Sequence, residues 1–212
     1  MKKEDRILTD EELRTEVNSS QKRTRLIAEA ALLAALCYIG FQFFRIDIPV
    51  GPEKTAFHFG NVFCMLAALL IGGWWGGLAG GIGMGIADLT SGYAASAIPT
   101  FILKLGIGLV VGFLAHRVFH LNEEKEKTAI LWKSAVASAG GALFNLIFDP
   151  LIRYFYKLYI LGLPQEWAKA LAKMGALTTL VNGIVAVVAS SLIYLAVRPA
   201  LRGSLVTSKE KA

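Results

Sequence analysis

Long apolar runs, separated by short charged regions, are the feature that most limits what this chain can fold into. Apolar residues make up 55% of the 212 residues, whereas a soluble domain rarely exceeds about half because water must cover its surface. A helix needs about 20 apolar residues to cross the roughly 30 Å hydrocarbon core of a bilayer. Several runs approach that length, so the chain is predicted to be an integral membrane protein.

Six apolar segments predict an all-α polytopic membrane protein with a bundle of six transmembrane helices. They cover residues 26–44, 59–71, a third segment that ends near residue 89, and residues 98–119, 129–156 and 174–197. The second and third segments are short and are joined by a glycine-rich turn at residues 72–77. A closely packed pair of helices is favoured there, and a single re-entrant hairpin is the alternative.

Basic residues are distributed unevenly between the connections. Fifteen of the 22 Lys and Arg residues lie in residues 1–25, 117–133 and 198–211. With six spans these regions fall on one side, and the positive-inside rule then places both termini in the cytoplasm. The expected organisation is a cytoplasmic polar leader at residues 1–24, a six-helix membrane substrate-binding domain at residues 25–198 and a cytoplasmic tail at residues 199–212.

The net charge of +6 does not indicate nucleic-acid binding. The basic residues flank apolar segments, as topology signals do, and they form no stripe interleaved with exposed aromatic residues. Cys37 and Cys64 both lie in apolar segments and are interpreted as small apolar fillers rather than as a disulfide or metal site. No cofactor or metal is expected.

Polar side chains within the predicted spans gather towards one membrane face. Such residues are costly in lipid, so they usually face a cavity or the bundle interior. In the six-span topology the candidates all fall in the outer half of the membrane: Asn61, Asp88, Tyr93, Lys104, Asn145, Asp149, Arg153 and Asn182. The sequence therefore predicts a polar cup that opens outward and binds a small polar molecule.

Structural roles remain open for several of these residues. Asp149 and Arg153 are spaced for an ion pair within one helix, and Asn61 or Asn182 could form an interhelical hydrogen bond. An unpaired ammonium at Lys104 would be expensive, so Asp88 or Asp149 is its expected partner.

Small residues mark helix contacts. Gly73, Gly77, Gly81 and Gly85 recur at every fourth position, which lets a helix approach its neighbours closely. The first segment carries two overlapping Ala-x-x-x-Ala pairs, formed by Ala30 with Ala34 and by Ala31 with Ala35. These alanines could pack internally or could form a docking face for another membrane subunit.

Catalytic motifs are not recognised in the sequence. It contains no G-x-S-x-G, H-E-x-x-H or Walker A pattern and no Cys/His cluster, so no enzyme activity is expected. Any active transport would need a partner that hydrolyses ATP.

Residues 59–115, together with the alanine pairs and the basic amino terminus, carry a family resemblance. The most specific elements are Gly60-Asn61, the glycine series, Ala87-Asp88, and Pro99 followed by Phe101 and Lys104. This pattern resembles the substrate-binding S component of an energy-coupling factor (ECF) transporter. It is similar to the hydroxymethylpyrimidine and pyridoxine branch, which is related to the riboflavin group.

The resemblance implies a non-catalytic subunit in the plasma membrane of a prokaryote. Such proteins bind a vitamin or precursor in an outward cavity covered by a loop, here about residues 45–57. They associate with a transmembrane coupling subunit and two cytoplasmic ATPases.

Ala30, Ala31, Ala34 and Ala35 match the docking motif in two possible registers. A pyridoxine- or hydroxymethylpyrimidine-like ligand is favoured, stacked on Tyr93 or Trp167, while riboflavin or another vitamin stays open. The alternative function is a self-sufficient secondary transporter of a small polar solute, coupled through Asp149 and Lys104.

Overall fold

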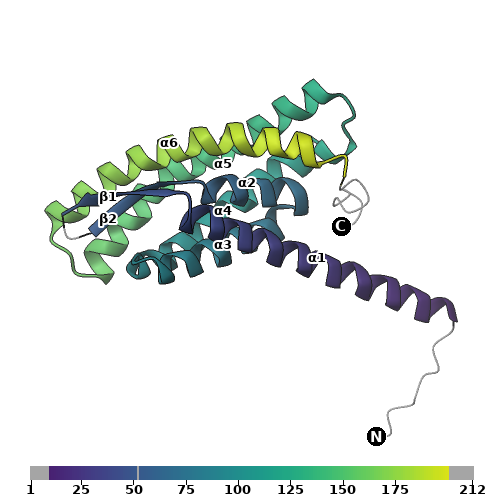
Figure 1. Ribbon diagram of the computed structural model, residues 1–212, viewed down its shortest axis with the longest axis horizontal. Helices are drawn as coiled ribbons and strands as arrows, with labels where there is room; N and C mark the ends of the chain where they lie inside the picture. Colours follow the sequence, from purple (N-terminus) through teal and green to yellow (C-terminus); the bar gives the residue numbers. More distant parts are fainter. Residues whose placement is uncertain (1–9, 52, 201–212) are drawn as a thin grey trace, which may run out of the picture.

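Six α-helices form the body of the molecule in the computed structural model, which describes residues 10–51 and 53–200 (Figure 1). They are α1 (Asp10–Gln42), α2 (Gly60–Ile71), α3 (Gly73–Thr90), α4 (Ala97–Gly112), α5 (Lys127–Phe155) and α6 (Gln165–Val197). Each contains or closely matches one predicted apolar segment, although α1 and α6 begin well before theirs. The helix of α1 thus runs through most of the region expected as a polar leader. Short helical turns extend or connect them: η1 (Ala94–Ser96), η2 (Phe113–Val118), η3 (Leu121–Glu123) and η4 (Tyr156–Ile160).

Within the described residues, four helical segments are long and apolar enough to cross a membrane. They are Val17–Gln42, Ala94–Val118, Lys127–Ile160 and Gln165–Val197. Helix α2 has only 12 residues, and α3 is an 18-residue, glycine-rich helix that is not among the four. Such apolar helices are typical of a multi-pass membrane protein.

A β-hairpin occupies the connection between α1 and α2, where the sequence was expected to form a loop. Strand β1 (Arg45–Val50) pairs antiparallel with β2 (Glu53–His58), with Arg45 opposite His58 and Val50 opposite Glu53. A two-stranded hairpin is marginal by itself in water, so its stability here depends on contacts with the helices. Figure 1 shows it at the end of the bundle that lies away from the start of α1 and the end of α6.

Glycines allow α3 to lie against α2 and α4 at backbone contact. A Cβ atom on Gly76 would lie 2.5 Å from the Cα of Ala68 in α2, and one on Gly108 in α4 would lie 2.2 Å from the Cα of Gly77. The predicted glycine series therefore packs against α4, but its last member, Gly85, has only a distant neighbour at 3.9 Å.

Apolar side chains fill the part of the bundle away from the hairpin. Met65 and Leu69 of α2, Ile107 and Val111 of α4 and Tyr194 of α6 are almost fully buried there. Across this core, Ser138 of α5 and Ser190 of α6 hydrogen-bond at 3.2 Å. The packed base supports the polar end of the molecule, where the hairpin lies.

Candidate substrate-binding site

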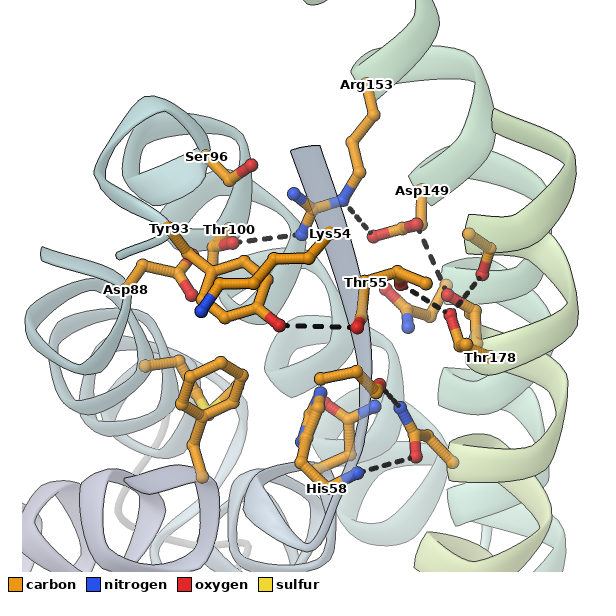
Figure 2. A pocket seen from close by; sticks show the side chains of 18 of the residues that line it. Lys54, Thr55, His58, Asp88, Tyr93, Ser96, Thr100, Asp149, Arg153 and Thr178 are labelled. Carbon is orange, nitrogen blue, oxygen red and sulfur yellow. Dashed lines mark hydrogen bonds and ion pairs between the residues drawn. The ribbon is translucent and has the colours of Figure 1, made fainter. Parts of the chain in front are cut away.

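A polar cavity of about 70 Å³ lies beneath the hairpin (Figure 2). All eight residues that the sequence analysis selected line this cavity, although they come from α2, α3, the α3–α4 connection, α4, α5 and α6: Asn61, Asp88, Tyr93, Lys104, Asn145, Asp149, Arg153 and Asn182. The structure thus brings the predicted residues together, while their role in binding stays a prediction. Phe41 and Met84 add apolar surface to the lining.

Asp149 and Arg153 form the ion pair that their spacing allows, at 2.8 Å between the Asp149 Oδ1 and the Arg153 Nε. The pair is also tied to two other helices. Arg153 Nη2 donates to the Thr100 hydroxyl of α4 at 3.0 Å, and the Thr179 hydroxyl of α6 donates to Asp149 at 3.2 Å. These contacts set the spacing of α4, α5 and α6 around the cavity.

Two of the predicted residues hold the hairpin in place. The Asn182 amide oxygen accepts from the His58 backbone N–H, and its amide nitrogen donates to the Ala56 carbonyl, both at 3.0 Å. The Tyr93 hydroxyl donates to Asp47 of β1 at 2.8 Å. Asn182 therefore pairs with the hairpin backbone rather than with another helix.

Other polar groups in the cavity have no hydrogen-bond partner among the described residues. They include the side-chain oxygens Asn61 Oδ1, Asp88 Oδ2 and Asn145 Oδ1, on residues that are 2–3% exposed. A buried polar atom left without a partner costs about 1–3 kcal/mol, so such groups call for a partner from outside the chain.

Lys104 is also buried, with 3% exposure. Within residues 10–51 and 53–200, no carboxylate lies within ion-pair distance of its ammonium. The expected pairing with Asp88 or Asp149 is therefore wrong. Asp149 is bound to Arg153 instead. The Lys104 ammonium instead faces the cavity with its charge uncompensated by a direct contact.

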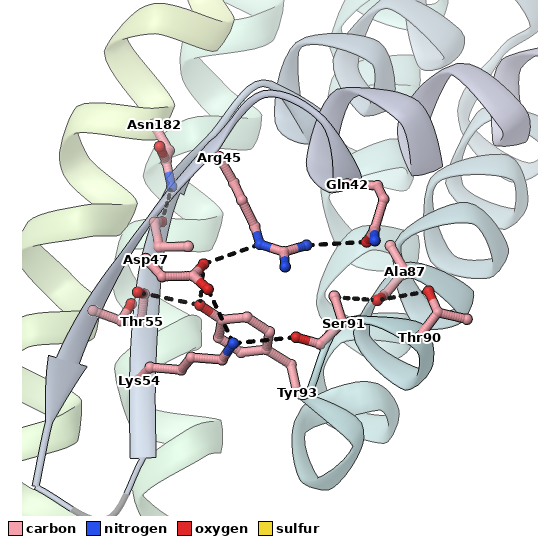
Figure 3. A network of polar contacts seen from close by, with 11 residues as sticks. Gln42, Arg45, Asp47, Lys54, Thr55, Ala87, Thr90, Ser91, Tyr93 and Asn182 are labelled. Atoms are coloured by element: carbon pink, nitrogen blue, oxygen red, sulfur yellow. Dashed lines mark hydrogen bonds and ion pairs between the residues drawn. The ribbon is translucent and has the colours of Figure 1, made fainter.

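Asp47 is the centre of the contacts that close the hairpin over the cavity (Figure 3). Its carboxylate accepts from Arg45 and Lys54 at 3.0 Å each and from the Tyr93 hydroxyl. Lys54 also donates to the Ser91 carbonyl at 3.2 Å. The hairpin is thereby fixed to the connection between α3 and α4.

The hairpin is also attached to the other side of the cavity. Glu53 forms an ion pair with Lys157, which follows α5. The hydroxyls of Thr55 and Thr178 lie 2.9 Å apart, and Gly51 at the hairpin tip lies against the Trp167 ring of α6. Because these contacts attach the hairpin on both sides of the cavity, the hairpin covers the cavity as a lid.

The protonation states of Asp47 and Tyr93 favour this closed arrangement. Burial tends to raise the pKa of Asp47, but hydrogen bonds from Lys54 and Tyr93 and the charge of Arg45 outweigh it and hold the pKa below its usual value. Burial and the Asp47 carboxylate raise the pKa of Tyr93 well above its usual value. At neutral pH the carboxylate is therefore ionised and the phenol remains its donor.

Several residues that line the cavity were not predicted from the sequence. Helical spacing could have identified some of them. Thr100 precedes Lys104 by one turn, Lys157 follows Arg153 by one turn, and Thr178 precedes Asn182 by one turn. The hairpin residue Thr55 gave no such signal, because a connecting segment has no fixed period. In the described residues, no group of three or more His, Cys, Asp or Glu residues could hold a metal ion.

Comparison with known proteins gives one family and one partial relative. Over 70 residues the chain is 36% identical to a protein of Pyrococcus woesei described as "Uncharacterized protein in gap 3'region". That similarity covers 33% of this chain and 47% of the relative, so the chain spans about half the length of that protein. No solved structure matches the chain.

The sequence profile described as "ECF-type riboflavin transporter, S component" matches residues 21–199. S components of this kind are transport subunits, generally non-catalytic, which bind small vitamin-like ligands and work with membrane and ATPase partners. The match covers α1 from residue 21 onwards, all of α2 to α6 and every predicted site residue. On this evidence the chain belongs to the ECF-type riboflavin transporter S component family.

Proposed function

We propose that this protein captures a vitamin or vitamin precursor outside the cell and delivers it with a transmembrane coupling subunit and two cytoplasmic ATPases. The observation that carries the proposal is the set of buried side-chain oxygens of Asn61, Asp88 and Asn145 that have no hydrogen-bond partner among the described residues and line one polar cavity. The buried Lys104 lines the same cavity. A bound ligand would supply their missing partners.

The proposed orientation places the hairpin end outside and both termini in the cytoplasm of a prokaryotic cell. It is supported by the uneven distribution of basic residues along the sequence, and by the described start of α1 and end of α6, which lie away from the hairpin (Figure 1). The cavity then opens towards the ligand source, and the lid formed by β1 and β2 controls entry.

The ligand favoured by the cavity is a single-ring compound such as pyridoxine or hydroxymethylpyrimidine. The small volume of the cavity, about 70 Å³, favours a small molecule, and hydroxyl or ring N–H groups would donate to Asp88 and the two amide oxygens. A ring nitrogen or oxygen would accept from Lys104. Riboflavin, which the family description names, has three fused rings and would require the hairpin to move away.

Calorimetric titration of the purified protein with pyridoxine, hydroxymethylpyrimidine and riboflavin tests this assignment. We expect a single-ring ligand to bind, and Asp88→Ala to weaken that binding by roughly tenfold or more because a charge-assisted hydrogen bond is lost. Glu166→Gln, an exposed acid at the start of α6, is the matched control and should bind normally. Riboflavin binding alone would contradict the single-ring assignment, and unchanged binding by the Asp88 variant would contradict the site.

Docking to the coupling subunit is proposed to use Ala31 and Ala35. Both are exposed, and Ile27 and Ile39 extend the same face of α1. The other register packs internally, because a Cβ atom on Gly83 of α3 would lie 2.2 Å from the Ala34 carbonyl oxygen. The exposed register is therefore the one that a partner helix can reach.

A self-sufficient secondary transporter is the second candidate, favoured by the buried, uncompensated charge of Lys104. Its other proposed coupling residue, Asp149, is held by Arg153 and Thr179, which makes proton exchange there difficult. Liposomes that contain this protein alone should not accumulate the ligand. Accumulation that a protonophore abolishes would support the carrier and contradict the S-component proposal.

A further inference from the structure

The two cysteines of the chain face each other close to the cavity. Cys37 of α1 and Cys64 of α2 are separated by 27 positions, yet their Sγ atoms lie 3.6 Å apart. Both are free thiols, with exposed fractions of 0% and 1%. From the sequence the two cysteines are interpreted as small apolar fillers, because nothing in their spacing indicates that α1 and α2 bring them into contact.

Helix α3 holds the two thiols together from one side. A Cβ atom on Gly80 would lie 3.0 Å from the Cys64 Sγ, and one on Gly83 would lie 3.0 Å from the Cys37 Cβ. A disulfide has its sulfurs about 2.05 Å apart, so bonding requires an approach of roughly 1.5 Å.

Only a thin layer of side chains separates this pair from the cavity. Cys37 and Cys64 pack in one cluster with Phe41 and Met84, and both of those side chains line the cavity. Lys104, which also lines it, interacts electrostatically with both sulfurs. A small neutral molecule in the cavity therefore has a short path to the thiols, whereas a large or charged reagent does not.

We propose that Cys37 and Cys64 form a redox-active dithiol that closes to a disulfide when hydrogen peroxide enters through the cavity. One sulfur attacks a peroxide oxygen, the O–O bond breaks, and a sulfenic acid and one water form. The second sulfur then attacks the sulfenic sulfur, the S–O bond breaks, and the hydroxyl leaves as a second water. Two thiols lose two electrons and two protons, and the peroxide is reduced to two waters.

The disulfide would join the two helices that carry the lid. Strands β1 and β2 lie between Cys37 and Cys64 in the chain, so the bond closes a loop that contains the whole hairpin. The root of that loop is already tight, because the Phe59 N–H hydrogen-bonds to the carbonyls of Gly40 and Phe44. Oxidation would therefore restrict opening of the lid, whichever ligand the cavity binds.

Thiol counting on the full-length protein in detergent tests the proposal. After hydrogen peroxide treatment, quenching and unfolding, we expect both alkylatable thiols to be lost and the peptide pair to lose the mass of two hydrogen atoms. Dithiothreitol should restore both thiols. Cys37→Ser and Cys64→Ser should each give a sulfenic acid, without the internal bond, that dimedone traps when it is added together with the denaturant.

Several results would overturn the proposal. These are thiols that stay alkylatable at a peroxide concentration that oxidises the unfolded chain, sulfinic acids in place of the disulfide, or disulfide-linked dimers as the main product. Glutathione disulfide, which is large and charged, tests the route and should leave the folded protein reduced. Oxidation by glutathione disulfide as fast as by peroxide would show that the thiols are reached by another path.

Discussion

At the scale of single residues, Lys104 lowers the stability of the fold but offers a hydrogen-bond donor to a ligand. An ammonium buried without a counter-ion lowers stability, because desolvation is not offset by a direct ion pair. Asp88 and Lys104 line the same cavity but do not pair, so a ligand with both a donor and an acceptor edge can bridge them. A buried charge without an ion-pair partner is typical of a functional site that is maintained at the expense of stability.

Lys104→Met should therefore change binding and stability in opposite directions. Methionine keeps the length of the side chain but removes the charge, so we expect ligand affinity to fall roughly tenfold or more and the melting temperature in detergent to stay the same or rise. Lys169→Met, at an exposed position of α6, is the control and should alter neither. A lower melting temperature with normal affinity would mean that Lys104 is structural.

At the scale of secondary-structure elements, close backbone contact holds α3 against its neighbours, whereas polar side-chain contacts hold the hairpin in place. The glycines of α3 could be predicted from the sequence as a packing face, because their spacing of four is a property of one helix. The hairpin could not, because its register and closure depend on Asp47, Tyr93 and Thr178, which are far apart in the chain. Contacts within one helix are readable from spacing, but contacts between a connection and distant helices are not.

Gly108→Ala should destabilise the fold by about 1–3 kcal/mol. Its new Cβ atom would meet the backbone of Gly77 at 2.2 Å, and backbone cannot rotate away. Gly85→Ala on α3 is the matched control, because its nearest neighbour within 4 Å lies at 3.9 Å and alanine favours a helix interior. Thermal unfolding of both variants should show a loss for Gly108→Ala and no loss for Gly85→Ala. Equal effects would mean that close contact between α3 and α4 is not needed.

Asp47→Asn should open the lid more often. The carboxylate is about one-third exposed, so losing its charge should weaken closure by about 1 kcal/mol and speed ligand dissociation roughly fivefold. The pKa of Asp47 is lowered in the closed lid. Its contribution is therefore complete above the ordinary pKa of about 3.9 and is lost as pH falls through the lowered pKa.

Stopped-flow dissociation checks this pH dependence. The unmodified protein should release ligand at a constant rate above about pH 5 and faster in stronger acid, whereas Asp47→Asn should be fast throughout and lose this acid-dependent step. Glu166→Gln should behave like the unmodified protein. An acid-induced acceleration of equal size in both the unmodified protein and Asp47→Asn would assign it to another group.

At the scale of the whole molecule, the sequence predicted the segregation of polar and apolar halves better than it predicted individual partners. The cost of polar groups in lipid gathers all eight predicted residues around one cavity, and that tendency is visible in the sequence. Spacing indicates the pair within α5, but pairing between helices is not visible in the sequence, because Lys104 and Arg153 compete for the same carboxylates and three-dimensional distance decides between them. The same holds for α1, where burial and not sequence distinguishes its two alanine registers.

Replacing Ala31 and Ala35 together by Leu tests whether the exposed face of α1 meets the coupling subunit. Small residues let two membrane helices approach closely, and larger side chains hold them apart. We therefore expect the double variant to bind ligand normally but to lose co-purification with the coupling subunit and the ATPases. Ala139→Leu, on an exposed position of α5, is the control for added bulk in lipid and should still assemble. Normal assembly of the double variant would place the docking face elsewhere. Loss of both ligand binding and assembly would mean that this face supports the fold, because a docking surface outside the cavity should leave the cavity intact.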